Sequence, residues 1–336
     1  MESGDKILCS EAAIEFEFDA SGYGYQAEIT THSVEISLER TIRVPEDDQE
    51  HWLPPTFGSF ELTPTDYGSL KLPDEIKRRR GVCFPIYEHE ALWLNFRLES
   101  DHFTLPVALR IAAGKINAVS GQTWSEATPS EQDYIVVPDQ PWLDGFNSGN
   151  NVIRQFVATE MGKGQSVEAY LTGEEAWGGI QVLAIPMKPE RYTKMIAEQI
   201  AERERFGGIE YSDLAEPMDM EMCCASESMS MGLGAGGKIR QTIETDPYGV
   251  DAWDFSRAQR LFISMINAGV WETVSGEAPH PSPIDAKTYN KSGGKWFHLD
   301  GKQDIGPSPS FGDLPPLTGP EEEVDLTIPA FLRRQS

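Results

Sequence analysis

Two turn-like stretches of the chain place tryptophan and carboxylate side chains near each other. Trp142 and Asp144 belong to the first stretch, and Glu174, Glu175 and Trp177 belong to the second. Tryptophan rings on a β surface can stack on sugars, and paired carboxylates perform acid–base work in glycoside hydrolysis. These five residues are the predicted binding surface for a small molecule or a glycan. The alternative is that the tryptophans cover the core from loops, which is the commoner use of large aromatic residues.

A second candidate is a soft-metal site in an acidic, methionine-rich stretch. Met218, Met220 and Met222 alternate along the chain and are followed directly by Cys223 and Cys224. Thioethers and thiolates suit Cu(I), and alternate residues of an extended segment lie on one side of it. The alternative is that these adaptable side chains pack where the stretch contacts the rest of the protein. Apart from this metal, the sequence predicts no cofactor.

The glycine-rich stretch 232–238 matches two phosphate-binding patterns, GxxxxGK and GxGxxG. A phosphate-binding loop also needs a buried strand before it, a hydroxyl residue after the lysine and a helix behind it. Here Ile239 occupies the hydroxyl position, the preceding residues are polar, and residues 238–244 have a strand pattern. We therefore expect a glycine-rich turn or a place of close backbone packing, and no nucleotide site.

The six histidines lack the spacing of a metal site. Two of them stand beside carboxylates, in Glu88-His89-Glu90 and in Asp101-His102, but neighbours in a strand point to opposite faces. The chain also lacks the patterns HExxH, CxxC and GxSxG. Because catalysis usually needs a convergent set of titratable groups, the sequence favours a binding role over a catalytic one.

Alternation of apolar and polar residues identifies the elements that position these groups. It runs through residues 14–19, 34–39, 94–98 and 103–111. A period of two places one set of side chains in a core and the other in water, which is typical of antiparallel sheet with one solvated face. Further strands are predicted at residues 134–137, 152–159, 166–172 and 179–185. The predicted fold class is mainly β, an antiparallel sandwich or jelly roll, with a smaller α+β C-terminal part.

The pattern changes after residue 188, which suggests four parts. They are a β-sandwich-like domain (1–188), an amphipathic helix with an acidic Met-rich linker (189–231), an α+β part packing on the first domain (232–300) and a flexible acidic tail rich in Pro and Gly (301–336). The long helix is expected to fade at residue 206. Short helices are expected at residues 73–80, 267–274 and 285–290.

The composition limits the classes of partner. The formal net charge is −26 over 336 residues, and a chain this acidic is repelled by nucleic acid and by anionic membrane surfaces. No stretch approaches the roughly 18 apolar residues that span a bilayer, and the N-terminus lacks the basic start of a signal peptide. Four cysteines do not resemble a secreted disulfide framework. We therefore expect a soluble, cytoplasmic protein without a membrane span.

Several segments resemble a family of bacterial and fungal proteins of unknown function. They are residues 140–145, 153–158, 232–241, 246–249, 281–284 and 296–297. The resemblance covers most of residues 20–300. Members of this family are often labelled integral membrane proteins, and the resemblance implies no established activity, fold or site.

Taken together, these patterns favour a binding or self-assembling protein. Unpaired strand edges are templates for pairing with another copy, so a homo-oligomer is predicted. The tail would cover or bridge a neighbour through Ile328, Phe331 and Leu332. Two alternatives stay open: an enzyme that acts on a small molecule or glycan through the loop carboxylates and tryptophans, and copper binding through the Met/Cys stretch.

Overall fold

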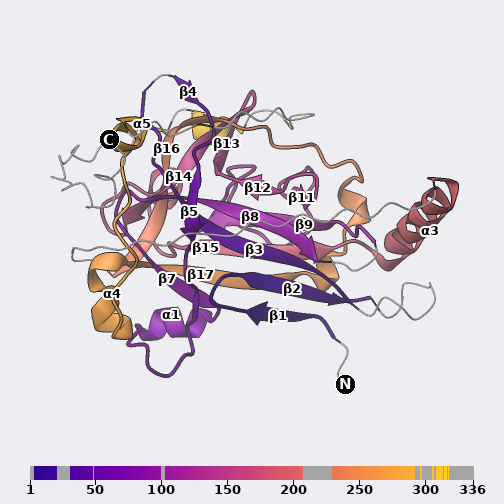
Figure 1. Cartoon of the computed structure of the whole chain (residues 1–336), viewed down its shortest axis with the longest axis horizontal. Coiled ribbons are helices and arrows are strands. Elements are labelled where there is room, and N and C mark those ends of the chain that lie inside the picture. The colour runs from indigo at the N-terminus through magenta and orange to yellow at the C-terminus, as the bar shows by residue number, and fades with distance from the viewer. Residues whose placement is uncertain are drawn as a thin grey trace, which may run out of the picture.

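The computed structural model describes the greater part of the chain. The described residues are 4–20, 31–47, 49–99, 103–206, 229–291, 296, 305, 308–312, 314, 315 and 317. Within them the chain is mainly β, and 17 strands are hydrogen-bonded into one sheet that is antiparallel apart from two pairings (Figure 1). The predicted fold class is confirmed, with one continuous sheet supplying both layers.

The first layer runs from an edge strand to the glycine-rich strand. Its strands, in spatial order, are β1 (Lys6–Cys9), β2 (Ile14–Asp19), β3 (Thr31–Thr41), β8 (Ala91–Glu99), β14 (Val152–Glu160) and β16 (Ser230–Arg240). Shorter strands lie alongside: β4 (Glu50–His51) beside β16, β5 (Thr56–Ser59) beside β3, β12 (Trp142–Leu143) beside β8 and β13 (Gly145–Gly149) beside β14.

The second layer includes the last described strand along the chain. In spatial order it comprises β7 (Val82–Ile86), β17 (Gln259–Asn267), β15 (Ile180–Pro186), β9 (Val107–Ala113) and β11 (Ile135–Val137). Two short strands extend it, β6 (Thr63–Pro64) beside β7 and β10 (Ile116–Asn117) beside β9. The layers join where Ser230 and Met231 of β16 pair with Ile266 and Met265 of β17.

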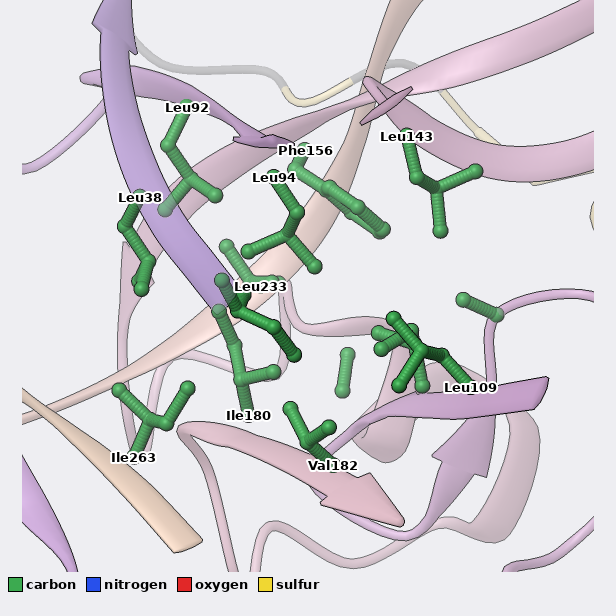
Figure 2. Close-up of a cluster of buried hydrophobic side chains, with 14 of the residues drawn as sticks. Leu38, Leu92, Leu94, Leu109, Leu143, Phe156, Ile180, Val182, Leu233 and Ile263 are labelled. Carbon is green, nitrogen blue, oxygen red and sulfur yellow. The ribbon is translucent and has the colours of Figure 1, made fainter. Parts of the chain in front are cut away.

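The alternation seen in the sequence builds the core between the layers. In β2 every second residue is buried, and the residues between them are half-buried. The buried sides of β2, β3 and β8 belong to the same apolar cluster as the facing sides of β9, β15 and β17. Figure 2 shows this meeting, with Leu38 and Leu94 from one layer and Leu109, Val182 and Ile263 from the other. Burial of this apolar surface, at about 25 cal/mol per Å², is the main stabilising contribution to the fold.

The second layer differs from the expectation of one solvated face. All seven residues of β9 and all seven of β15 are buried. Helix α3 (Pro189–Phe206) covers the outer side, where Tyr192 and Ile196 join Leu183, Ile185 and Trp253 in a second apolar cluster. A partly solvated face is therefore found on β2 and β8 of the first layer, and the expectation is wrong for the strand predicted at 103–111.

The other described helices are short. They are α1 (Asp74–Arg79), α2 (Val167–Thr172), α4 (Ala268–Ser275), α5 (Ala286–Lys291) and α6 (Pro309–Gly312), with 3₁₀ turns at Val250–Ala252 and Phe255–Arg257. Helices α1 and α4 lie together at the lower left of Figure 1, where Ile76 and Trp271 share a cluster. The long helix and the three short ones expected from the sequence are confirmed.

The strand predicted at residues 166–172 is wrong, because residues 167–172 form α2. Ser166 is its N-cap, with a hydroxyl that accepts a hydrogen bond from the Ala169 amide at 3.1 Å. Gly173 ends the helix in the left-handed region, at a φ of 78°. A serine N-cap and a glycine C-cap are strong local helix signals, and here they outweigh the strand-like residues between them.

The glycine-rich stretch is a strand rather than a turn, since residues 232–237 lie in the middle of β16. Its glycines do permit close packing. A Cβ on Gly237 would collide with the carbonyl oxygen of Pro45, and one on Gly234 would collide with the Leu317 side chain. The stretch therefore has small residues because its neighbours approach too closely for side chains, and it is not the strand–loop–helix unit of a phosphate-binding loop.

The predicted 232–300 part does more than pack on the first domain. Its strands β16 and β17 pair with β14, β15 and β7, so these two strands complete the same sheet. The Met/Cys stretch and the tail residues Ile328, Phe331 and Leu332 lie outside the described residues.

Among the described residues, no helix has both the length and the apolar character needed to cross a membrane.

Candidate functional site

Trp142 and Asp144, two of the predicted site residues, lie where β12 meets β13 in the first layer. Trp142 is half-buried, and its carbonyl oxygen accepts hydrogen bonds from the side-chain amides of Gln140 at 3.0 Å and Gln241 at 3.5 Å. Asp144 is only 3% exposed, and the Gln241 amide donates to its Oδ2 at 2.8 Å. These two predicted residues therefore share one partner, Gln241.

The environment of Asp144 changes its acidity. Burial raises the pKa of its carboxyl to about 7, and the hydrogen bond from Gln241 opposes that rise only in part. The Asp144 amide also donates to Gln241 Oε1 at 3.0 Å, so the side-chain amide is fixed at both ends. A carboxyl that titrates near neutral pH is common in functional sites and in buried structural networks alike. Because Asp144 contacts protein rather than solvent, its titration acts on the stability of the fold.

Glu175 organises the loop between β14 and α2. Its carboxylate accepts hydrogen bonds from the amides of Gly162 (2.5 Å), Gly164 (3.1 Å) and Ser166 (3.3 Å), and from the Ser166 hydroxyl (2.6 Å). Burial raises the pKa of Glu175, but these hydrogen bonds outweigh burial and hold the pKa below its usual value. The charged carboxylate therefore fixes the start of α2.

Glu174 and Trp177, on either side of Glu175, have different surroundings. Glu174 is exposed. Trp177 is half-buried next to two cations, with Arg79 Cζ 5.1 Å and Lys115 Nζ 5.2 Å from its ring centre. Cation–π contacts of this kind contribute roughly 0.5–2 kcal/mol, so they hold the Trp177 ring against the protein.

The structure separates the five predicted residues into two groups. Among the described residues, no hydrogen bond, ion pair or ring contact joins Trp142 and Asp144 to Glu174, Glu175 or Trp177. The predicted soft-metal ligands fall outside the described residues: Met218, Met220, Met222, Cys223 and Cys224. In the part of the chain that is described, no group of three or more His, Cys, Asp or Glu side chains could hold a metal ion.

A buried charge cluster surrounds Glu90, which sequence analysis treated only as a neighbour of His89. Glu90 is 1% exposed and accepts hydrogen bonds from Arg40 Nε at 3.1 Å and His280 Nε2 at 2.9 Å. The Tyr87 hydroxyl and the Arg40 guanidinium donate in turn to the carbonyls of His280 and Pro281. The sequence could not show this cluster, because His280 follows Glu90 by 190 positions. The cluster ties the chain after α4 to the end of the sandwich.

A cleft of about 240 Å³ opens between α2 and residues 314, 315 and 317 of the C-terminal segment. Its lining is mainly apolar and includes Val167, Tyr170, Ala235, Leu314 and Leu317. The Tyr170 side chain is 52% exposed at its rim. An exposed aromatic side chain beside an apolar hollow is typical of a binding surface.

Arg154 of β14 fixes the strand side of the cleft to the C-terminal segment. This arginine is 7% exposed and donates to three carbonyl oxygens, those of Gly236 (2.5 Å), Ala235 (2.9 Å) and Leu314 (3.0 Å). Burial lowers the pKa of Arg154, which still keeps its charge because an arginine titrates far above neutral pH. The three hydrogen bonds hold residue 314 at a fixed place along β16.

Two further contacts hold the segment after Leu314. Leu317 shares a small apolar cluster with Ala91 and Val157, in the space that Gly234 leaves by having no side chain. Its carbonyl oxygen accepts a hydrogen bond from Arg43 Nη2 at 3.1 Å. The glycine-rich pattern was the sequence signal of this close approach, whereas nothing in the sequence marked Arg154 or Tyr170.

Comparisons with known proteins do not identify a family for this chain. No protein-family model, curated protein or solved structure matches this chain. The resemblance to a bacterial and fungal family therefore stays a prediction.

Proposed function

We propose that the protein is a binding protein whose ligand places an apolar group in the cleft between α2 and residues 314, 315 and 317. The observation that carries the proposal is an open apolar hollow of about 240 Å³ with Tyr170 exposed at its rim. An apolar cavity of about 150 Å³ is already large enough to hold benzene. The cleft has room for one aromatic or branched aliphatic group, such as a side chain of an extended peptide.

The polar groups around the cleft support a binding role. The Ser166 hydroxyl donates to Glu175 Oε1 and accepts from the Ala169 amide, so it caps α2. Arg154 donates to backbone carbonyls and holds the opposite wall. These side chains build a fixed hollow, and fixed walls reduce the conformational entropy that is lost when a ligand binds.

The glycan-enzyme alternative has less support from the geometry. Acid–base hydrolysis of a glycosidic bond needs two carboxyl groups roughly 5–10 Å apart around one substrate. Asp144 is buried with Gln241, and Glu175 is engaged by the loop before α2, in the other group of predicted residues. The cleft beside α2, in contrast, is open to solvent.

The test is a fluorescence titration of the full chain with N-phenylnaphthylamine, a neutral aromatic probe that brightens in apolar surroundings. We expect saturable binding, weakened about tenfold or more by Tyr170→Glu, because a carboxylate at the rim loses hydration when an apolar group binds beside it. Tyr67→Glu is the matched control, since Tyr67 is also exposed (61%) and does not line the cleft. Equal probe affinity in the wild-type protein and Tyr170→Glu would contradict the proposal.

Self-association is a second candidate function, favoured by one edge of the sheet. Within the described residues β1 pairs with β2 on one side only, and Leu8 on β1 is 42% exposed. An unpaired edge with an exposed apolar side chain is a template for another copy. The net charge of −26 opposes contact between copies, and salt weakens this repulsion because the Debye length falls to about 8 Å at physiological ionic strength.

Light scattering across a salt series tests this second candidate. We expect a dimer that forms as salt is added and is lost in Leu8→Lys, because a lysine on an edge strand disfavours pairing. The control is Tyr170→Lys, which changes the charge by the same amount on α2 rather than on β1. A monomer at every salt concentration would exclude association through this edge.

A further inference from the structure

We infer that the ligand of the cleft is a zwitterionic amino acid with an apolar side chain, such as phenylalanine or leucine. The inference rests on the proposed function, because it names the ligand of the same cleft. It is carried by a pair of opposite charges, Arg154 behind one wall and Glu175 behind the other, each held by neutral groups. These two charges select the polar part of the ligand, whereas the hollow selects its side chain.

Arg154 supplies a positive charge directly behind the strand wall of the cleft. The side chain is buried, and two of the carbonyl oxygens that it binds belong to the lining residues Ala235 (2.9 Å) and Leu314 (3.0 Å). Its three hydrogen-bond partners are uncharged, and it has no ion-pair partner within the described part of the chain. A buried charge is screened less than an exposed one, so this charge acts on the cleft.

Glu46 reduces the positive charge of the strand wall only in part. Burial lowers the pKa of Arg154, and the charge of Glu46 opposes that shift. Glu46 also forms an ion pair with Arg43, which donates to the Leu317 carbonyl at 3.1 Å. Two cations therefore accompany one carboxylate, and the three side chains together leave one net positive charge on this wall.

Glu175 supplies a negative charge behind the helix wall. Its carboxylate accepts hydrogen bonds from the Gly164 amide at 3.1 Å and the Ser166 hydroxyl at 2.6 Å, and both of these residues line the cleft. Lys163, the neighbour of Gly164 in the chain, binds two other carboxylates at 2.6 Å and 3.0 Å. Among the described residues, Glu175 therefore has no ion-pair partner, and its charge acts on the cleft from the side opposite to Arg154.

Opposite charges on the two walls favour a ligand that carries both charges. A carboxylate is attracted toward Arg154, and an ammonium group is attracted toward Glu175. An α-amino acid joins these two groups at the carbon that bears its side chain. The side chain can therefore enter the hollow while both charged groups stay hydrated at its opening. Such a ligand has no net charge, so the chain's net charge of −26 does not repel it, as it repels an anion.

The size of the cleft matches one apolar side chain. A cavity of about 150 Å³ takes a benzene ring, so a cleft of about 240 Å³ accommodates the ring of a phenylalanine or the side chain of a leucine. The Tyr170 ring, exposed at the rim, is available to cover the inserted group. A residue inside a peptide has neither charge on its backbone, so the two walls distinguish a free amino acid from a peptide side chain.

Calorimetric titration of the full chain with four matched ligands tests the inference. L-Phenylalanine carries both charges, and 3-phenylpropionate lacks the ammonium group. The other two ligands are 2-phenylethylamine, which lacks the carboxylate, and N-acetyl-L-phenylalaninamide, which lacks both charges. We expect L-phenylalanine to bind about tenfold or more tightly than each of the other three, and tenfold corresponds to about 1.4 kcal/mol. Tyr170→Glu should weaken this binding, whereas Tyr67→Glu should leave it unchanged.

Two variants assign each preference to its wall. Glu175→Gln should make L-phenylalanine and 3-phenylpropionate bind equally, because these ligands differ only in the ammonium group. Arg154→Gln should make L-phenylalanine and 2-phenylethylamine bind equally, because these differ only in the carboxylate, whereas Arg154→Lys keeps the charge and should keep the preference. The matched controls are Glu174→Gln and Arg78→Gln, which remove the same charges from exposed side chains that do not line the cleft. Both preferences should persist in the controls.

Three outcomes with the wild-type protein would overturn the inference, whether or not every variant folds. They are no binding of L-phenylalanine, equal binding of N-acetyl-L-phenylalaninamide, which would assign the cleft to a peptide, and tighter binding of either singly charged ligand. The proposed function fails separately. If N-phenylnaphthylamine binds equally to the wild-type protein and Tyr170→Glu, the proposed function fails. If the probe binds in a Tyr170-dependent way and the four ligands bind equally, only the inference fails.

Discussion

Replacement of Asp144 by asparagine isolates the cost of a buried carboxylate at the β12–β13 junction. The carboxyl is 3% exposed, and burial raises its pKa from an ordinary value of 3.8 to about 7. A folded-state pKa above the unfolded one means that the folded protein holds the proton more tightly. Stability is therefore highest below the unfolded pKa and falls as the pH rises toward 7. At about 1.4 kcal/mol per pKa unit, the ionised carboxyl costs the folded state up to about 4 kcal/mol above pH 7.

Asparagine keeps the shape of Asp144 and an oxygen that can accept from Gln241, but it cannot ionise. We expect Asp144→Asn to have a higher free energy of unfolding than the wild-type protein, by a margin that grows by about 2–3 kcal/mol between pH 5 and pH 8. Urea unfolding at a series of pH values measures this margin. Asp251→Asn is the control, since its side chain is 78% exposed, and its margin should stay flat. A margin for Asp144→Asn that is constant or shrinks with pH would refute the reasoning.

Three further predictions concern the rest of the fold. Glu90→Gln leaves two basic partners without their buried carboxylate and should lower the free energy of unfolding in urea by about 3 kcal/mol. Glu88→Gln is the control, because Glu88 pairs at the surface and its loss should cost less than about 1 kcal/mol. Equal costs for the two variants would contradict the buried cluster. Gly237→Ala forces a Cβ against a backbone carbonyl and should lower the free energy of unfolding, measured by calorimetry, by about 1–3 kcal/mol. Gly68 lies in open space, so Gly68→Ala should change this free energy by less than about 0.5 kcal/mol. ATP, GTP and NAD should not raise the Tm, although a true site would add about 2.7 kcal/mol at a hundredfold excess over Kd; a rise that Lys238→Ala abolishes would show phosphate binding at β16.

Alternation predicted β2 and β8 because it reports directly on one-sided burial. Phe16 and Phe18 are buried while Glu15 and Glu17 between them are not, as the period of two requires. The same rule failed for β9 and β15, because whether their outer side is covered depends on α3. That helix brings Tyr192 onto Leu183, and no local pattern shows which face a distant helix will cover.

The candidate site was less predictable for the same reason. Trp142 and Asp144 were found from a local turn, but their shared partner Gln241 follows Asp144 by 97 positions. The cleft combines a helix that was predicted as a strand with a segment that was predicted as tail. Ser166 and Gly173 carried the helix signal, and only the glycines of β16 signalled that another segment packs there.

The central claim is that an apolar group binds between α2 and residues 314, 315 and 317. A methyl NMR titration of the full chain with N-phenylnaphthylamine tests it most directly, because it shows where the probe binds. We expect saturable chemical-shift changes concentrated on the methyl groups of Val167, Ala235, Leu314 and Leu317. The methyl groups of Ile185, in the second apolar cluster, should be unchanged. Saturable shifts that appear elsewhere and spare these four residues would contradict it.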